Sequence, residues 1–198
     1  MKTVYIERST GECRDGKWVE SLDLEGAERI VVGTGPGSFA GIRSALAFAQ
    51  GYALGAKCEV LGLPSACACA AQVFGSIRHS ADAGNQSIKQ STNQSIRLAV
   101  VGDARQGKIW IALFNGFELE KDVFQVDQSE LKGTVPMDYV VTTPDEKRIG
   151  AFLRETFGDR YLGGQTPTAE GLRQFAEACP SILKSEPLPI YLNPAVRP

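Results

Sequence analysis

The chain has 198 residues, of which 43% are hydrophobic and 22% charged, which is close to the composition of an average globular protein. A chain of this size and composition can bury a core, so a wholly disordered protein is excluded. The 21 basic and 23 acidic residues give a net charge of −2. This charge argues against a strongly basic surface for nucleic acid and leaves room only for a local basic patch.

The N-terminal sequence MKTVYIERSTGE carries charge from its start and lacks an apolar stretch, so we expect no signal peptide. The longest apolar stretch, residues 39–56, is interrupted by Arg43, Ser44 and Gln50. An arginine at the middle of a bilayer costs about 2.5–3.5 kcal/mol. We therefore expect a cytoplasmic protein with no membrane span.

The five cysteines form no CxxC pair, and His79 is the one histidine. A zinc site normally needs four such ligands at tight spacing. The sequence therefore predicts buried, reduced thiols and no metal site.

Apolar runs separated by turn residues predict a first α/β lobe over residues 1–74. A continuous apolar run is typical of a strand buried on both faces, and a periodic one of a helix. The predicted strands are Val4–Glu7, Lys17–Leu22, Arg29–Gly33 and Cys58–Leu63, and the predicted helices are Ser38–Leu54 and Pro64–Phe74.

Residues 75–97 read GSIRHSADAGNQSIKQSTNQSIR, a polar stretch in which NQSI occurs twice. Such a stretch buries too little apolar surface to offset the entropy lost on ordering. We predict a flexible insertion here, with a solvated His79.

A second α/β lobe is predicted over residues 98–198, again with strands first and strand–helix alternation afterwards. The shared order suggests two related halves. The predicted strands are Leu98–Val101, Lys108–Phe114, Phe117–Val126 and Tyr139–Thr142; the predicted helices are Pro144–Thr156 and Thr168–Ala178, followed by an extended, proline-rich tail.

The most distinctive segment is the glycine-rich loop Gly33–Ser38, between a predicted buried strand and a helix. Free N–H groups at such a helix start can bind an anion. The same glycine pattern is also expected of a tight strand-to-helix turn that binds no ligand. A P-loop is excluded because no lysine follows the glycines. The dinucleotide pattern GxGxxG/A is matched only weakly, by Gly35, Gly37 and Ala40, with Glu59 at the wrong end of the next strand.

Charged residues of a predicted hairpin turn, Asp103, Arg105 and Lys108, either belong to such a site or are simply solvated. The candidate anion- or nucleotide-binding residues are Gly35, Gly37, Ser38, Asp103 and Arg105.

The helix predicted after the loop is apolar nearly all round. One apolar line runs through Phe39, Ile42, Leu46, Ala49 and Ala53, and small residues recur at every fourth position. A helix of this kind is buried on two sides, either within its own chain or against a partner. The candidate partner contacts are Phe39, Ile42, Arg43, Leu46, Ala49 and Ala53.

At these residues the chain resembles a known family. Gly35–Arg43, GPGSFAGIR, resembles the GPGSFTGLR signature of the TsaB (YeaZ) family, the bacterial non-catalytic partner in making the threonylcarbamoyladenosine of tRNA. Residues 49–55 resemble the end of the same family helix, Asp103–Trp110 its DARxGEVY hairpin, and Pro187–Leu192 its closing segment.

The resemblance implies a two-lobed actin/Hsp70-like (ribonuclease H-like) α/β fold. It implies a subunit that binds the catalytic protein TsaD through first-lobe helices, Gly35–Arg43 among them, and meets tRNA only indirectly. TsaD carries an HxxxH metal motif that a chain with one histidine cannot form, so we expect no catalytic residues. No resident cofactor is implied, and ATP or ADP at a partner interface stays open. The expected partner is a TsaD-like subunit, or a second copy meeting the first through Ser38–Leu54.

Two departures from the family pattern predict a truncated first lobe. The family opens with a strand resembling LAIDTS, whose aspartate faces a nucleotide cleft, whereas residues 4–10 here read VYIERST. The family also has a long helix where only Asp23–Glu28 connects two predicted strands. Two alternatives therefore stay open: a nucleotide-binding α/β protein using Gly33–Ser38, and a degenerate family member that has lost its partner.

Overall fold

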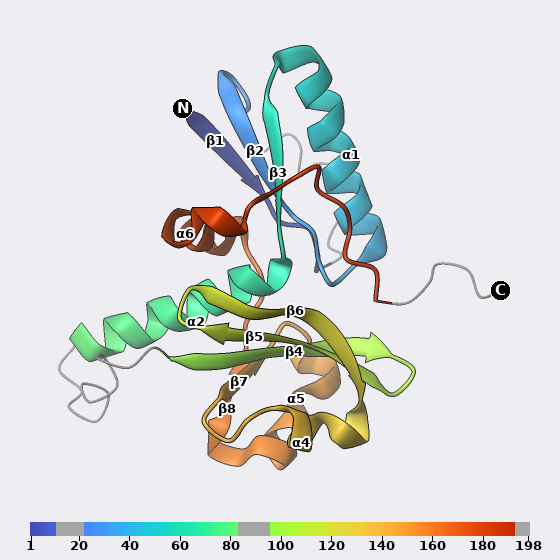
Figure 1. Cartoon of the computed structure of the whole chain (residues 1–198), viewed down its shortest axis with the longest axis vertical. Coiled ribbons are helices and arrows are strands. Elements are labelled where there is room, and N and C mark those ends of the chain that lie inside the picture. The colour runs from blue at the N-terminus through green and yellow to red at the C-terminus, as the bar shows by residue number, and fades with distance from the viewer. Residues whose placement is uncertain (11–21, 83–95, 193–198) are drawn as a thin grey trace. The chain divides into compact units, whose positions relative to one another are not determined.

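The computed structural model describes residues 1–10, 22–82 and 96–192. The chain folds into two compact units, each with its own sheet (Figure 1). Unit 1 comprises residues 1–68 and 167–198, and unit 2 comprises residues 69–166. This division differs from the predicted lobes 1–74 and 98–198, because the last part of the chain returns to pack on the first sheet.

Unit 1 is built on a sheet with the strand order β1-β2-β3-β9. Its elements are β1 (Lys2–Ile6), β2 (Ala27–Gly33), α1 (Phe39–Ala56), β3 (Glu59–Leu63), the start of α2 (Ser65–Asp82), α6 (Ala169–Ala178), the short helix η4 (Pro180–Ile182) and β9 (Lys184–Ser185). The first three strands are parallel, and β9 pairs antiparallel with β3. The described residues between β1 and β2 contain no helix, and the predicted strand at residues 17–22 lies almost wholly outside the described residues.

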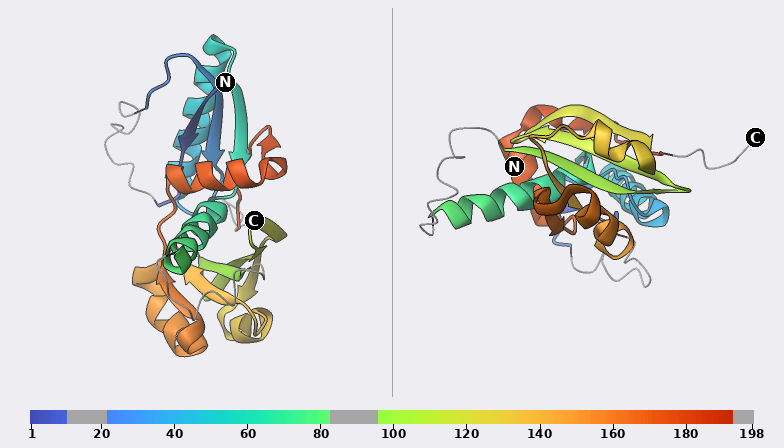
Figure 2. Two further views of the ribbon diagram at one scale, coloured as in Figure 1. Left: turned by 90° about the vertical axis from the view of Figure 1, so that its left-hand side faces the viewer. Right: turned by 90° about the horizontal axis from the view of Figure 1, so that it is seen from below.

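Helices α1 and α6 cover opposite faces of this sheet (Figures 1 and 2). Ile30 and Val32 of β2 point into a core cluster with α1, and strand alternation puts Val31 on the opposite face, where it is also buried. The predicted burial of β2 on both faces is therefore confirmed.

The N-terminus of α1 follows from its capping residue. Ser38 has an extended backbone, and its Oγ accepts a hydrogen bond from the Gly41 N–H at 3.3 Å, as expected of a serine N-cap. The helix ends at Ala56, and the C-cap residue Lys57 has a left-handed backbone. The predicted helix Ser38–Leu54 is thus confirmed and runs two residues further.

Unit 2 is built on a sheet with the strand order β6-β5-β4-β7-β8. Its elements after α2 are β4 (Arg97–Arg105), β5 (Lys108–Asn115), β6 (Glu118–Asp127), η2 (Gln128–Glu130), α4 (Leu131–Thr134), β7 (Val140–Thr143), α5 (Glu146–Phe157), η3 (Gly158–Arg160) and β8 (Tyr161–Gly164). Strands β4, β5 and β6 form an antiparallel meander, and β7 pairs with β4 in parallel. Sequence reasoning missed α4 and β8, which have only four residues each.

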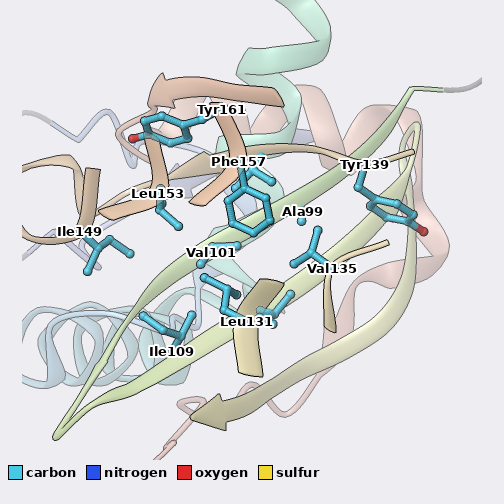
Figure 3. Close-up of a cluster of buried hydrophobic side chains, with 12 residues drawn as sticks. Ala99, Val101, Ile109, Leu131, Val135, Tyr139, Ile149, Leu153, Phe157 and Tyr161 are labelled. Carbon is cyan, nitrogen blue, oxygen red and sulfur yellow. The ribbon is translucent and has the colours of Figure 1, made fainter. Parts of the chain in front are cut away.

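One face of this sheet carries the main core of unit 2 (Figure 3). Alternate residues of β4 and β5 meet α4 and α5 there. The cluster comprises Ala99, Val101, Ile109, Ile111, Leu131, Val135, Tyr139, Val141, Ile149, Leu153, Phe157 and Tyr161. The opposite residues of the same strands, such as Val100 and Phe114, are also buried, so this sheet too is covered on both faces.

Helix α2 corrects the predicted insertion at residues 75–97. The helix does not stop near Phe74 but continues to Asp82, because no proline or glycine pair interrupts it and adding residues to a formed helix is much easier than starting one. The Ser76 hydroxyl also donates to the Gln72 carbonyl at 2.9 Å. The rest of the predicted insertion, up to residue 95, and the side chain of His79 lie outside what the structure describes.

A close cross-strand contact in unit 2 gives a first prediction. Gly102 of β4 lies opposite Trp110 of β5, and a Cβ at Gly102 would overlap the buried indole. We expect Gly102→Ala to destabilise the protein by about 1–3 kcal/mol through overpacking, measured by urea unfolding. Gly133→Ala, at an exposed helical site with open space around it, is the control. Equal stability of the two variants would contradict the prediction.

Candidate functional site

The glycine-rich loop Gly33–Ser38 joins the end of β2 to α1. Gly35 has φ +95°, a conformation that favours glycine, and its peptide bond to Pro36 is cis. The loop lies at the carboxyl ends of the parallel strands β2 and β3, where α/β proteins commonly bind ligands. This position makes it the first region to test for an anion site.

Three backbone N–H groups of the loop donate hydrogen bonds within unit 1. Thr34 N–H donates to the Leu63 carbonyl at 2.9 Å, and Gly35 N–H donates to Ser65 Oγ at 3.0 Å. Ser38 N–H donates to the Ser9 carbonyl at 2.6 Å. An anion site at a helix start needs N–H groups that point at the ligand. The N–H groups of the predicted candidates Gly35 and Ser38 instead form hydrogen bonds within unit 1.

The loop is also in close contact with the segment that follows β1. A Cβ at Gly37 would overlap the backbone of Ser9, and a Cβ at Gly41 would overlap the carbonyl oxygen of Arg8. Only glycine lets two backbones approach this closely. The glycines at these two positions therefore allow the start of α1 to pack directly on the residues that follow β1.

Glu7, which sequence reasoning did not single out, lies beside this contact. Its Oε1 accepts a hydrogen bond from the Ser9 N–H at 2.7 Å, while its buried Oε2 has no hydrogen-bond partner in the described part of the chain. Burial raises the pKa of the Glu7 carboxyl, and hydrogen bonds from Ser9 and Ser65 oppose the shift. The sequence signal that could have identified Glu7 is its position, because an acidic residue directly follows the apolar run VYI.

The structure corrects the predicted partner face of α1. Ile42, Leu46 and Ala49 are buried in the core of unit 1, and Ala53 packs against the same cluster. Another apolar side of the helix is partly covered as well, since Phe48 and Tyr52 pack against the same cluster and the Tyr52 hydroxyl donates to the Leu24 carbonyl at 2.7 Å. Two-sided apolarity is thus largely satisfied inside this chain, and it does not by itself require a partner.

The exposed face of α1 is made of other residues, most of them small. We call it the α1 outer face; it consists of Phe39, Ala40, Arg43, Ser44, Ala47, Gln50, Gly51, Leu54 and Gly55. Phe39 is 48% exposed and Leu54 91% exposed, and a Cβ at Gly51 or Gly55 would meet nothing within 4 Å. Of the six predicted contacts, Phe39 and Arg43 lie on this face.

The C-terminal segment packs beside the N-terminal end of the α1 outer face. Ile190 N–H donates to the Thr34 carbonyl at 2.9 Å. The ring of Tyr191 lies 5.4 Å from that of Phe39, and the Arg43 guanidinium lies 4.9 Å from the Phe39 ring. The helix thus presents an aromatic and cationic end and a smooth, small-residue middle.

The remaining predicted anion-site residues, Asp103 and Arg105, belong to unit 2, at the β4–β5 hairpin. The Asp103 carboxylate accepts from the Arg105 N–H at 2.8 Å and forms an ion pair with Arg148 at 3.3 Å. The Asp103 N–H donates to Asp145 Oδ2 at 2.9 Å. These bonds fix the turn, whose residues Gln106 and Gly107 have φ +55° and +73°, as a type I′ hairpin requires.

Within residues 1–10, 22–82 and 96–192, no three His, Cys, Asp or Glu side chains gather as they would around a metal ion. No helix of these ranges has both the length and the apolar character needed to cross a bilayer. Cys58, Cys67 and Cys69 are buried.

Comparison with known proteins adds to this geometry. Residues 20–106 match the family model described as TsaD, tRNA N6-adenosine threonylcarbamoyltransferase. A comparison with curated proteins finds no match. Among solved structures, an uncharacterized protein with similarity to peptidase YeaZ from Pseudomonas aeruginosa has a TM-score of 0.61 at 19% identity, over 91% of this chain and 80% of that one.

YeaZ from Pseudomonas aeruginosa itself has a TM-score of 0.60 at 19% identity, over 89% of this chain and 80% of that chain. The chain has the YeaZ fold. The predicted resemblance to YeaZ and the predicted α/β fold are thereby confirmed.

The carboxyl of Asp145 gives a prediction about pH. Burial, and next the nearby carboxylate of Asp103, raise the pKa of Asp145. A raised pKa in the folded state means that stability is complete below the ordinary aspartate pKa and falls as pH rises through the raised one. We expect Asp145→Asn, which keeps an acceptor for the Asp103 N–H, to gain stability over the wild type as pH rises from 3.5 to 7.

Chemical unfolding at a series of pH values measures this difference, and exposed Asp159→Asn is the control. A stability difference between Asp145→Asn and the wild type that stays constant with pH would contradict the assignment.

The α1 outer face gives a prediction about the stability of the free chain. Gly51 sits in the helix interior with open space around it, and a glycine there costs roughly 0.5–1 kcal/mol relative to alanine. We expect Gly51→Ala to raise the free energy of unfolding by about that amount, measured by urea titration. A destabilised variant would show that Gly51 makes a contact inside the monomer.

Proposed function

We propose that the protein is a non-catalytic TsaB-like subunit, which binds a TsaD-like catalytic protein and supports threonylcarbamoyl transfer to adenosine of tRNA. The observation that carries the proposal is the match of residues 20–106 to the threonylcarbamoyltransferase family model. That range contains the glycine-rich loop, α1 and β4, which includes Asp103. The likeness of the fold to YeaZ over nine-tenths of the chain supports it.

The chemistry of the chain favours a supporting role over a catalytic one. The single histidine, His79, cannot supply an HxxxH pair of metal ligands. Asp103, which sits in the DARxGEVY-like segment, is engaged in fixing its own hairpin. We therefore assign binding, rather than bond making or breaking, to this protein.

We place the partner contact on the α1 outer face rather than on the apolar line expected from the sequence. Small side chains such as Ala47 and Gly51 allow a second helix axis to approach closely, which gives extensive dispersion contact. Phe39 and Leu54, exposed at the two ends of the helix, supply apolar area that a partner would cover. Arg43 adds a cation for an acidic group of the partner.

Two glycines support this placement. Gly51 and Gly55 lower helix stability in the free chain and face open space. A second backbone lying along the α1 outer face would use that space. A second copy of this chain is the competing occupant, since it would present the same face.

Binding of a nucleotide by the loop Gly33–Ser38 remains a prediction, and the geometry does not favour it. The N–H groups of Thr34, Gly35 and Ser38 are all engaged inside unit 1. Nucleotide binding at a partner interface would therefore draw on groups outside these three.

A bulky substitution tests the proposed contact. Ala47 is exposed in the middle of α1, so Ala47→Trp changes no core packing while blocking a close helix–helix approach. We expect the tagged wild-type chain to copurify with the TsaD-like protein of its own cells, and Ala47→Trp to lose at least about tenfold in binding, equivalent to about 1.4 kcal/mol. Ala151→Trp, at an exposed site on α5, is the matched control.

Depletion of the protein followed by nucleoside analysis of tRNA tests the pathway, and we expect threonylcarbamoyladenosine to fall. Unchanged threonylcarbamoyladenosine, together with no recovery of a TsaD-like protein, would instead identify a degenerate relative that has lost its partner. A homodimer broken by Ala47→Trp, with no TsaD-like protein bound, would assign the α1 outer face to a second copy.

A further inference from the structure

Glu7 is a buried acid that the proposed function does not use. It follows β1 directly, and its Oε2 lies so close to the Cα of Gly33 that a Cβ there would overlap it. Ser65 Oγ, from the start of α2, lies beside the same position. The carboxyl group is therefore enclosed by β2, by α2 and by its own segment.

The charge balance around Glu7 is poor for an ionised carboxylate. Gly33, Ser9 and Ser65 have no ionisable side chains, and the groups that bond to Glu7 are the Ser9 N–H, the Ser9 and Ser65 hydroxyls and the Arg8 backbone N–H. Of these four residues, Arg8 alone has an ionisable side chain. The buried Oε2 has no partner of good hydrogen-bond geometry, and burying an unpaired charge is strongly unfavourable.

The same carboxyl group begins a chain of hydrogen bonds that leads to α1. Glu7 Oε1 accepts from the Ser9 N–H at 2.7 Å, and the Ser9 carbonyl accepts from the Ser38 N–H at 2.6 Å. Ser38 caps α1, and Phe39 is its first residue. The position of the N-terminal end of α1 therefore depends on a segment that Glu7 holds.

We propose that Glu7 is a proton-dependent latch: protonated, it holds the segment Glu7–Ser9 against the glycine loop and the start of α1, and ionised, it releases them. The neutral form keeps an acceptor for the Ser9 N–H without leaving a charge unpaired. Ionisation places a charge on the enclosed oxygen, and the segment then opens to hydrate it. The latch is a property of the free chain, so its test does not depend on whether the proposed partner binds.

The direction of the pH effect follows from the raised pKa of Glu7. In the open form the carboxyl has an ordinary glutamate pKa of about 4.3, so opening is coupled to release of one proton between that value and the raised pKa of the closed form. Within this window the opening equilibrium constant rises up to about tenfold per pH unit. Below the window the latch is closed, and above it the opening constant no longer changes.

Hydrogen exchange of the full-length chain tests the latch. We expect the amides of Ser9 and Ser38, after correction for the intrinsic pH dependence of exchange, to lose up to about tenfold in protection per pH unit within the window. Glu7→Gln, neutral and of equal shape, should abolish this dependence. Glu155→Gln, at an exposed site on α5, should behave like the wild type.

A carbon-13 titration of the Glu7 carboxyl in the wild type gives a second readout, which needs no variant to fold. We expect its midpoint to lie above the ordinary glutamate pKa of about 4.3. An ordinary midpoint of about 4.3, or the same pH profile of Ser9 and Ser38 exchange in the wild type and in Glu7→Gln, would overturn the proposal.

Discussion

The close approach of two backbone segments determines how unit 1 presents its surface. The residues after β1 lie directly on the glycine loop, because Gly37 and Gly41 have no side chains to separate Ser9 and Arg8 from the loop and the helix. The Ser9 carbonyl then takes the Ser38 N–H, and Ser38 caps α1. Once this contact is made, the rotation of α1 on the sheet is fixed, and with it the set of residues that faces outward.

The parts of the candidate site that could be predicted are those that depend on neighbouring residues in the sequence. The predicted helices begin at Ser38 and Thr168, and in the structure these residues are the N-caps of α1 and α6, whose hydroxyls accept from the N–H groups three residues later. The apolar run before the loop likewise identified β2. These are local features, and local sequence determines them.

The outward face of α1 could not be deduced in the same way. Alanine and glycine suit a buried contact as well as an exposed surface, so the periodicity of Ile42, Leu46 and Ala49 did not show whether they face the sheet or a partner. The deciding contacts come from residues far away in the chain, such as Leu24, whose carbonyl accepts from Tyr52. Glu7 escaped notice for a related reason, because its burial depends on Gly33 and Ser65, which are distant in sequence.

The return of the chain to its first sheet has a consequence for the order of folding. Unit 2 is one continuous stretch, whereas unit 1 is completed only when α6 and β9 have joined it. During synthesis unit 2 can therefore close while the first sheet still lacks its α6 cover and one edge strand, and domains that emerge whole generally fold as units. The packing of unit 1, which contains the signature loop, is therefore completed only after α6 and β9 have been synthesised.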